Sequence, residues 1–307
     1  MKQTTRNVLM VRPAAFGFNE QTASNNVFQQ ALEASPDDVQ AMALSEFERA
    51  VSMLREKGIN VYVLNDSAVP PKPDAIFPNN WISFGHNGLV TLFPMHAPNR
   101  REETHLPWES LIRKQFVIRN IKDLRNEALN NRFLEGTGSI IFDHLSKVAY
   151  ANKSVRTNEE LFIAYCRFIG YEPILFDALN EAGLPYYHTN VILSIGSTFA
   201  VLCSDSMVNK HQKSLVIERL IHSGRELIEV SFDQVNQFAA NILQLQSGEG
   251  ESLIALSQLA YDAFLPEQRS VLKKHGEVIV APIPTIEKVG GGSFRCMIAE
   301  IFLSDKQ

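Results

Sequence analysis

The sequence of residues 35–64, SPDDVQAMALSEFERAVSMLREKGINVYVL, contains the pattern that decides the fold. Ser35 and Pro36 suit an N-cap and the first helical position, and apolar residues then follow at helical spacing. Gly58 stands where a helix commonly ends, and the β-rich run Ile59–Leu64 follows it directly. The stretch therefore predicts one long helix that leads into a strand.

The same order of helix, glycine and strand recurs along the chain. Helices predicted to end at Gly170, Gly224 and Gly276 are each followed by a strand-like run. The separations 170 − 58 = 112, 224 − 170 = 54 and 276 − 224 = 52 indicate a period of about 54 to 56, with one unit lacking its glycine around Arg119. Five to six such units fit into 307 residues.

Between these helices the sequence predicts strand pairs. Ile82–Phe84 pairs with Val90–Phe93 across a turn in which Asn87-Gly88 is typical of a type I′ hairpin. Val191–Ile195 and Phe199–Cys203 form a second pair. Each unit is therefore expected to be ββαβ, and several units arranged in a ring bury faces that one unit alone leaves exposed.

Local signals set the starts of the other helices. Thr157 and Glu160 predict a capping box, a helix is expected from about Lys213, and Pro266-Glu267 opens the last one. No linker divides the chain, so residues 1–307 are expected to form a single domain of α/β class.

Composition excludes several classes of protein. With 45% hydrophobic residues, 21% charged residues and a net charge of -5, the chain is typical of globular proteins and is not expected to bind nucleic acid. No apolar run approaches the roughly 20 residues that span a membrane, and no secretory signal is evident, so a cytoplasmic location is expected. Three widely spaced cysteines predict neither disulfides nor a zinc site, and neither metal nor cofactor is expected.

Polar residues that could take part in catalysis recur at one phase of the repeat. Counted from the helix-ending glycine of its unit, Asp74 comes 16 residues later (74 − 58), His188 18 later (188 − 170) and Cys296 20 later (296 − 276). Glu135 falls at a comparable point of the second unit. Units related by rotation would bring these residues to one end of the ring, as a nucleophile, a general acid/base and orienting carboxylates.

The three cysteines have different contexts. Cys166 and Cys203 are expected to be small buried hydrophobic residues in a helix and a strand. Cys296 follows Gly290–Gly292, where consecutive glycines permit close backbone approach and free N–H groups to support a thiolate or an oxyanion.

At this point the sequence resembles the penteins, the guanidino-group-modifying superfamily. The motifs, in chain order, are residues 73–80 (PDAIFPNN), 97–102 (APNRRE), 134–138 (LEGTG), 154–158 (SVRTN), 188–190 (HTN) and the glycine-rich run to Cys296. They cover nearly the whole chain and are similar to those of the arginine deiminase-related and amidinotransferase family, most of all to its citrulline utilization hydrolase branch. The resemblance implies a pseudo-fivefold α/β propeller of five ββαβ modules.

The resemblance also implies the catalytic roles. Cys296 would attack the central carbon of the substrate head group and form a covalent intermediate. His188 would protonate the leaving amine and then activate water. Glu135 would hydrogen-bond the head-group nitrogens and His188. The enzyme would be a hydrolase of C–N bonds other than peptide bonds.

Substrate-binding roles follow in the same way. Asp74 would bind the α-ammonium group, while Arg100 and Arg156 would grip the α-carboxylate. The remaining residues assigned to the substrate site are Phe77, Asn79, Asn80 and Asn190. Arg101 is a weaker candidate, because an ion pair with Glu102 or Glu103 explains it equally well.

Two departures from the family pattern point to the substrate. Asn80 and Asn190 stand where guanidine-processing relatives carry carboxylates, and 135–138 reads EGTG in place of Glu-Gly-Gly-Asp. A guanidinium offers only donors, whereas a neutral ureido group needs a donor facing its oxygen. Carboxylates facing a ureido group would be uncompensated, at ~3–5 kcal/mol for each broken buried pair. A free ureido amino acid is therefore expected, with citrulline converted to ornithine, carbon dioxide and ammonia.

Other interpretations stay open at this level. Asp177 or Asp205 would serve as carboxylate ligands if the substrate were a guanidine. The chain would then be an arginine or dimethylarginine deiminase-type hydrolase, or an amidinotransferase. A non-catalytic amino-acid-binding protein on the same scaffold is the alternative from another class. Homo-oligomers are possible, and the segment Pro13–Asn26 is either a substrate-covering loop or, by slight preference, an ordinary connection.

Overall fold

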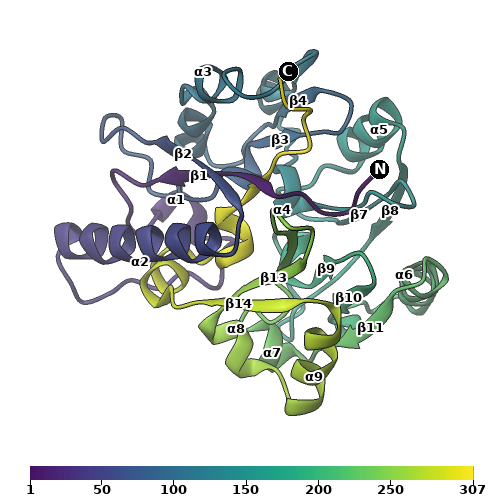
Figure 1. The fold of residues 1–307 in the computed structure, drawn as a ribbon. Helices are drawn as coiled ribbons and strands as arrows, with labels where there is room; N and C mark the ends of the chain where they lie inside the picture. Colours follow the sequence, from purple (N-terminus) through teal and green to yellow (C-terminus); the bar gives the residue numbers. More distant parts are fainter. Residues whose placement is uncertain (307) are drawn as a thin grey trace.

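The computed structural model describes residues 1–306, which form five three-stranded sheets. In each sheet the middle strand pairs antiparallel with one neighbour and parallel with the other. Figure 1 shows the sheets following one another around the middle of the molecule. From the antiparallel to the parallel strand they are β15 (Ala299–Glu300), β1 (Asn7–Arg12), β2 (Asn60–Asn65); β3 (Ile82–Phe84), β4 (Leu89–Leu92), β5 (Asn120–Asp123); β6 (Ile140–Asp143), β7 (Val148–Asn152), β8 (Glu172–Phe176); β9 (Leu193–Ile195), β10 (Phe199–Leu202), β11 (Glu226–Glu229); and β12 (Leu243–Gln246), β13 (Ser252–Ser257), β14 (Glu277–Ala281).

Helical segments connect the middle strand of each sheet to its parallel strand. The α-helices are α1 (Glu20–Ala23), α2 (Pro36–Glu56), α3 (Trp108–Ile112), α4 (Gly136–Ser139), α5 (Glu159–Ile169), α6 (Lys210–His222), α7 (Phe232–Val235), α8 (Gln258–Ala263) and α9 (Pro266–His275). Short 3-10 or π turns are η1 (Pro78–Asn80), η2 (Pro98–His105), η3 (Arg125–Asn130), η4 (Thr189–Val191), η5 (Ser204–Ser206), η6 (Ile286–Gly290) and η7 (Phe294–Met297). The expected ββαβ order is therefore present, and the first sheet takes its antiparallel strand, β15, from the far end of the sequence.

The antiparallel edge strands face the middle of the molecule. β15 contacts β3, β6 contacts β9, and β9 contacts β12. We refer to β3, β6, β9, β12 and β15 as the inner strands. Residues just before these strands gather in one place, because the segments that precede them, η1, α4, η4 and η7, contact one another.

The predicted long helix is α2, and its signals act as expected. The Ser35 side chain accepts a hydrogen bond from Asp38 N, Pro36 occupies the first turn, and Gly58 adopts φ of 75° after the helix. A left-handed conformation of this kind carries little steric cost only in glycine.

Three local predictions are wrong. Asn158, not Thr157, caps α5, because its side chain reaches Leu161 N at 2.9 Å and Asn is the stronger cap. α6 begins at Lys210, since Asn209 caps it there. The β3–β4 turn is not type I′: four residues separate the strands, and only Gly88 among them has positive φ.

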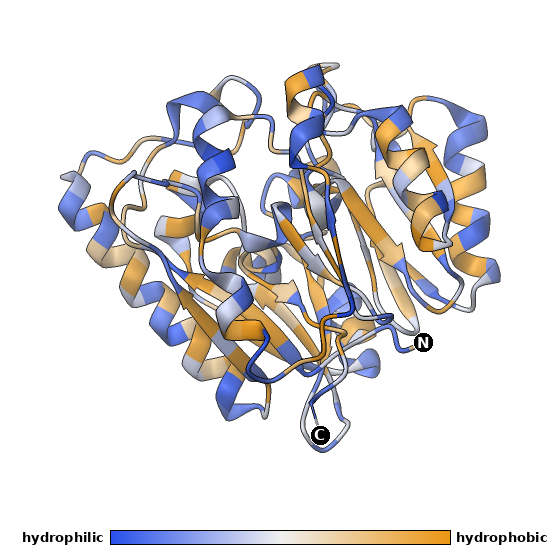
Figure 2. Cartoon of the chain, turned by 90° about the horizontal axis from the view of Figure 1, so that it is seen from above, coloured by the Kyte–Doolittle hydropathy of each residue, from blue (hydrophilic) through white to orange (hydrophobic). Residues whose placement is uncertain are grey.

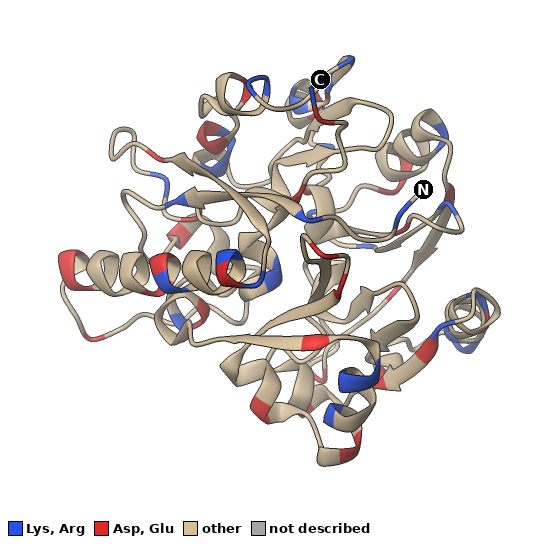
Figure 3. Ribbon diagram, in the orientation of Figure 1, with Lys and Arg blue, Asp and Glu red and all other residues tan. Residues whose placement is uncertain are grey.

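Apolar residues of the sheets and of the inner helix faces form the core. Figure 2 shows hydrophobic strands flanked by helices that carry hydrophilic residues on their outer sides. Lys, Arg, Asp and Glu of both signs are spread over outer helices such as α2, α6 and α9 (Figure 3). Within residues 1–306 no helix has the length and apolarity needed to cross a membrane.

Candidate active site

The candidate active site is built from residues that immediately precede the inner strands. η1 leads into β3, Glu135 and α4 lead into β6, η4 leads into β9, and η7 leads into β15. η1 contacts both α4 and η7, and α4 contacts η4. Segments that occupy the same position in each sequence repeat therefore lie close together in the fold.

Glu135 and His188 form a buried pair at the centre of this site. Glu135 Oε2 lies 2.8 Å from His188 Nε2, and Glu135 Oε1 accepts a hydrogen bond from His96 N at 2.9 Å. Burial alone would raise the pKa of Glu135, but Arg156, His188 and Arg100 outweigh it and hold that pKa well below its usual range. Glu135 is therefore ionised at neutral pH.

His188 is a neutral imidazole at neutral pH. Burial lowers its pKa to about 4, although Glu135 acts in the opposite direction. A neutral ring that donates Nε2–H to Glu135 keeps Nδ1 as an acceptor. A Cβ added to Gly138 would lie 2.7 Å from this Nδ1 atom, so the glycine leaves that face of the ring open. The residue can accept a proton at Nδ1 and pass it on.

Cys296 lies in η7 with its side chain buried. Its Sγ atom is 3.4 Å from Asn190 Nδ2 and 3.4 Å from Asn241 Nδ2. Burial raises the pKa of the thiol, and the contact with Asn241 opposes that effect. Cys166 and Cys203 are also buried, which raises their pKa to about 12 and about 11, as expected of unreactive core thiols.

The glycine run before Cys296 gives room to an aromatic ring. A Cβ on Gly290 or Gly292 would approach the Phe77 ring to 2.8 Å and 3.0 Å. Gly291 has φ of 63°, and its carbonyl accepts a hydrogen bond from Tyr187 Oη at 2.8 Å. Side chains at these positions would separate Phe77 from the loop that carries Cys296.

Asp74 has one satisfied and one free oxygen. Oδ2 accepts a hydrogen bond from Asn19 Nδ2 at 2.7 Å and lies 3.6 Å from Arg100 Nε. Oδ1 is buried and has no hydrogen-bond partner among residues 1–306. Burial raises the pKa of this carboxyl, so a positively charged partner would stabilise its ionised form.

The N–H groups of Arg100 donate to other residues of the protein. Nε and Nη2 bind the two Glu103 carboxylate oxygens at 2.8 and 3.0 Å, and Nη1 donates to Asn80 Oδ1 at 3.0 Å. Burial raises the pKa of Glu103 to about 7 against the opposing charge of Arg100. Arg100 therefore anchors Glu103, Asn80 and Asp74, and it presents no vacant fork to a ligand.

Arg156 is held differently. Its Nε donates to Asn25 Oδ1 at 2.9 Å, its Nη2 also donates to that oxygen, and its Nη1 lies 3.4 Å from Glu135 Oε2. The guanidinium carbon lies 4.6 Å from the centre of the Tyr187 ring. A single amide oxygen thus occupies the edge of the guanidinium that would otherwise receive a carboxylate.

The contacts of Asn19 and Asn25 correct the preference for an ordinary connection in Pro13–Asn26. Asn19 binds Asp74, Asn25 binds Arg156, and Asn26 Nδ2 donates to Gly291 O at 3.3 Å. The segment from Asn19 to Asn26 therefore lies against the site residues.

The asparagines of the site combine donors with acceptors. Asn79 Oδ1 accepts from Asn80 Nδ2 at 3.0 Å, while Asn79 Nδ2 is buried and without a partner among the described residues. Asn190 shows the opposite pattern, since its Nδ2 contacts Cys296 and its Oδ1 has no partner in the same part of the chain. Among the described residues, these two asparagines therefore offer one free donor and one free acceptor, in addition to the free oxygen of Asp74.

Asn241 is a site residue that was not predicted. It comes 17 residues after Gly224 (241 − 224), between the offsets of 16 and 20 counted for Asp74 and Cys296. The phase of the repeat was therefore sufficient to find it. Asn19 and Asn25 carry no such signal, because they lie outside the repeat.

Other residues considered from sequence lie elsewhere or bind differently. The side chains of Asp177 and Asp205 are 50% and 73% exposed and interact with Lys153 and Lys213, which removes them as carboxylate ligands. Arg101 donates to the carbonyls of Met95 and His96, at 3.1 and 3.2 Å, rather than forming the expected ion pair. Residues 1–306 contain no cluster of three or more His, Cys, Asp or Glu that would hold a metal ion.

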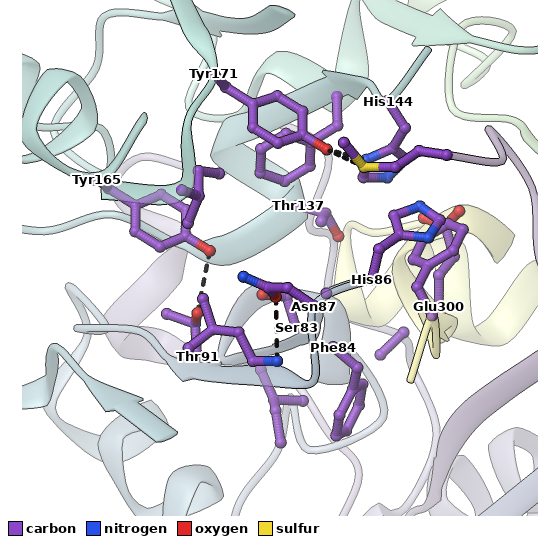
Figure 4. Close-up of a pocket in the computed structure, with 18 of the residues that line it drawn as sticks. Ser83, Phe84, His86, Asn87, Thr91, Thr137, His144, Tyr165, Tyr171 and Glu300 are labelled. Atoms are coloured by element: carbon purple, nitrogen blue, oxygen red, sulfur yellow. Dashed lines mark hydrogen bonds between the residues drawn. The ribbon is translucent and has the colours of Figure 1, made fainter. Parts of the chain in front are cut away.

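A separate cavity of about 250 Å³ lies next to β3 and β4 and is lined by a mixture of aromatic, aliphatic and polar residues. Figure 4 shows Thr137, His86 and His144 around it, with Tyr165 bonded to Thr91. Cys296, His188 and Glu135 do not line this cavity. Thr137 is the residue through which it adjoins the site, because Thr137 Oγ1 donates to Asn79 O at 3.3 Å.

The match of a family model over most of the chain, together with the five three-stranded sheets, places the protein in the pentein superfamily. The model of the family described as N,N dimethylarginine dimethylhydrolase, eukaryotic, matches residues 12–303, and the chain belongs to this family. No curated protein sequence matches the chain.

Solved structures show the same fold at low sequence identity. The N-terminal domain of ArgZ, covalently bound to a reaction intermediate, is 14% identical with a TM-score of 0.73, and the match covers 97% of this chain and 99% of that domain. The unliganded full ArgZ chain, an arginine dihydrolase from the ornithine–ammonia cycle in cyanobacteria, is 14% identical with a TM-score of 0.73. That match covers 96% of this chain but 40% of ArgZ, so this chain spans less than half of its length.

A dimethylarginine dimethylaminohydrolase variant that carries an adduct with S-methyl-L-thiocitrulline is 15% identical with a TM-score of 0.66. The match covers 97% of this chain and 100% of that chain.

Proposed function

We propose that this protein is a cysteine-dependent hydrolase that acts on the ureido group of a free amino acid, with citrulline as the substrate. One observation carries the choice of substrate: the site holds a free buried donor, Asn79 Nδ2, and a free buried acceptor, Asn190 Oδ1. A ureido group offers both a carbonyl oxygen and N–H groups, whereas a guanidinium offers donors only. The two carboxamides that touch Cys296 Sγ bring no charge to the head group.

The reaction balances as two half-reactions, of which only the second consumes water. Cys296 Sγ bonds to the ureido carbon, the bond from that carbon to the terminal nitrogen breaks, and ammonia leaves with the thiol proton delivered through His188. Water, deprotonated by His188, then attacks the thiocarbamate carbon and releases the thiol. The carbamate so formed separates into carbon dioxide and ornithine. Citrulline and one water thus give ornithine, carbon dioxide and ammonia.

The two ends of the substrate have separate partners in this proposal. The α-ammonium group pairs with Asp74 Oδ1, which is buried and free within residues 1–306. The α-carboxylate takes the place of Asn25 Oδ1 on Arg156, because that oxygen already receives both hydrogen bonds of the guanidinium edge. Arg100, whose donors are used internally, fixes Asp74 and Asn80 and does not bind the carboxylate itself.

A second candidate is arginine hydrolysed in two successive rounds to ornithine. The similarity of fold to ArgZ, which is an arginine dihydrolase, favours it. Glu135, an ionised carboxylate beside His188, would be the acceptor for the guanidinium in the first round. The second round would then be the citrulline reaction described above.

Release of ornithine and ammonia from purified protein, offered citrulline and arginine separately, tests these proposals. Ornithine from citrulline alone supports the ureido assignment. Ornithine from both substrates supports the dihydrolase. Accumulation of free citrulline from arginine contradicts both and identifies a deiminase. Cys296→Ala is the control and should remove every product.

Two further outcomes address the remaining interpretations. A new guanidino compound formed from arginine and an added amine would identify an amidinotransferase. Absence of turnover, together with no substrate-protected labelling of Cys296 by a haloacetamidine, would identify a binding protein.

The proposal also includes the domain organisation, the fold and the location of the protein. These are a single domain over residues 1–307, a pseudo-fivefold propeller built from the five sheets, and action in the cytoplasm on a small-molecule amino acid.

A further inference from the structure

Asn241 contacts the candidate nucleophile from a sheet that supplies no other predicted site residue. It lies two residues before β12 and is 1% exposed. Its Nδ2 atom donates to Cys296 Sγ at 3.4 Å and to Asn190 O at 3.0 Å. Its Oδ1 atom lies 3.6 Å from the same sulfur, in position to accept from the thiol. Both polar atoms of one carboxamide are therefore within reach of Sγ.

We propose that Asn241 is a positioning residue that serves both protonation states of Cys296. The thiol donates its S–H to Asn241 Oδ1, and the thiolate, once formed, accepts N–H from Asn241 Nδ2. This inference rests on the proposed role of Cys296 as nucleophile. An amide is suited to the task because it carries a donor and an acceptor side by side and has no charge.

The surroundings of the sulfur give Asn241 this importance. Among the described residues no Lys, Arg or His side chain hydrogen-bonds to Sγ, and His188 is directed to Glu135. Reactive thiolates commonly depend on a neighbouring cation. Here the charge of Arg295 acts to lower the pKa of Cys296 without a hydrogen bond to Sγ, and the carboxamides of Asn190 and Asn241 make the direct contacts. Hydrogen bonds to an ionised acceptor are stronger than those to a neutral one, so the two N–H donors favour the thiolate over the thiol.

Asn241 also orients the second carboxamide. One N–H of Asn241 is bonded to Asn190 O, and the Asn190 side chain provides the other N–H to Cys296 Sγ. Loss of Asn241 would therefore weaken both donors to the sulfur. A purely structural asparagine would hold the backbone of η4 without altering the acidity of the thiol.

The pH dependence of Cys296 alkylation by iodoacetamide, followed by peptide mass spectrometry, tests this proposal without any substrate. Asn241→Asp keeps the shape, removes the N–H donor and adds a negative charge beside the sulfur. We expect the apparent thiol pKa to rise and alkylation at neutral pH to slow by at least about tenfold, which corresponds to one pKa unit. Asn241→Ser, which keeps a hydroxyl donor and acceptor, should lie between Asn241→Asp and the wild type.

Asn152→Asp is the matched control. Asn152 is 0% exposed, and its Nδ2 donates to a backbone oxygen, that of Tyr186, at 2.6 Å, but it does not contact Cys296. Its alkylation profile should follow the wild type. The proposal is overturned if Asn241→Asp and Asn241→Ser, confirmed as folded by circular dichroism, alkylate with the wild-type pH profile. Because no turnover is measured, an incorrect choice of substrate would leave this result unaffected.

Discussion

Asn25 and Arg156, separated by 131 positions in the sequence, are joined by two hydrogen bonds that end on a single amide oxygen. Asn25 belongs to the segment 19–26 that lies against the site, and Arg156 is the proposed partner of the substrate carboxylate. The same guanidinium edge therefore holds the segment in place or binds the ligand. If Arg156 binds the substrate carboxylate as proposed, that carboxylate must displace Asn25.

Asn25→Ala should loosen the segment and expose Cys296. We expect faster alkylation of Cys296 by iodoacetamide at fixed pH, because the two bonds from Arg156 no longer hold residues 19–26 against the site. Ser24→Ala, which changes the adjacent residue without touching Arg156, is the control. Equal alkylation rates in the two variants would show that Asn25 does not restrain the segment.

The unfolding free energy should depend on pH through the titration of His188. Burial lowers its pKa to about 4, so between pH 6.5 and 4 the unfolded chain binds a proton here that the folded protein does not. The contribution is present above pH 6.5 and is lost as the pH falls towards 4, by an amount on the order of 3 kcal/mol.

Urea unfolding of the wild type and of His188→Gln at several pH values measures this contribution. The unfolding free energy of the wild type should fall more steeply than that of the variant between pH 6.5 and 4. Parallel curves would mean that His188 is protonated in the folded protein.

Removal of the Glu103 carboxylate should be costly. Glu103→Ala leaves Arg100 buried without its bidentate partner, and breaking a buried pair costs about 3–5 kcal/mol. Glu109→Ala is the matched control, because Glu109 and Arg113 form an ion pair of the same type with side chains 47% and 46% exposed. That change should alter the unfolding free energy by less than about 1 kcal/mol. Similar values for the two variants would contradict the anchoring role of Arg100.

Gly138→Ala should impair catalysis more than folding. The added Cβ would lie 2.5 Å from Asn80 Nδ2 and 2.7 Å from His188 Nδ1, so both side chains must shift. A displacement of about 1 Å commonly costs about 100-fold in rate, and we expect a loss of this size in kcat/KM. Gly17→Ala, where a Cβ meets no atom within 4 Å, is the control and should retain wild-type kinetics.

Much of the fold was predictable because the repeat is encoded locally. Capping residues, helix-ending glycines and β-rich runs act within a few residues, and α2, Gly58 and the strand pairs follow from them. Errors arose where two residues compete for one local role. Asn158 displaced Thr157 as the cap of α5, and a four-residue turn replaced the predicted type I′ turn of the β3–β4 hairpin.

The site was predictable as far as it obeys the repeat. Glu135 and His188 share a phase and form a hydrogen-bonded pair, while Cys296 contacts Asn190 and Asn241, of which Asn241 follows the same phase. Long-range partnerships were not accessible, because nothing near Asn25 in the sequence indicates that it will contact Arg156. The two hydrogen bonds from Arg100 to the Glu103 carboxylate could not be predicted either, because sequence spacing does not reveal that both side chains are buried.

The pairing of β1 with β15 has a consequence for biosynthesis. The antiparallel partner of the first sheet is made some 290 residues after β1, and Cys296 lies three residues before it. While the ribosome is still elongating, sheets two to five can assemble from contiguous stretches of the nascent polypeptide. Cys296, the proposed nucleophile, joins the other residues of the candidate site only when the closing strand arrives, so the emerging polypeptide carries no assembled candidate site.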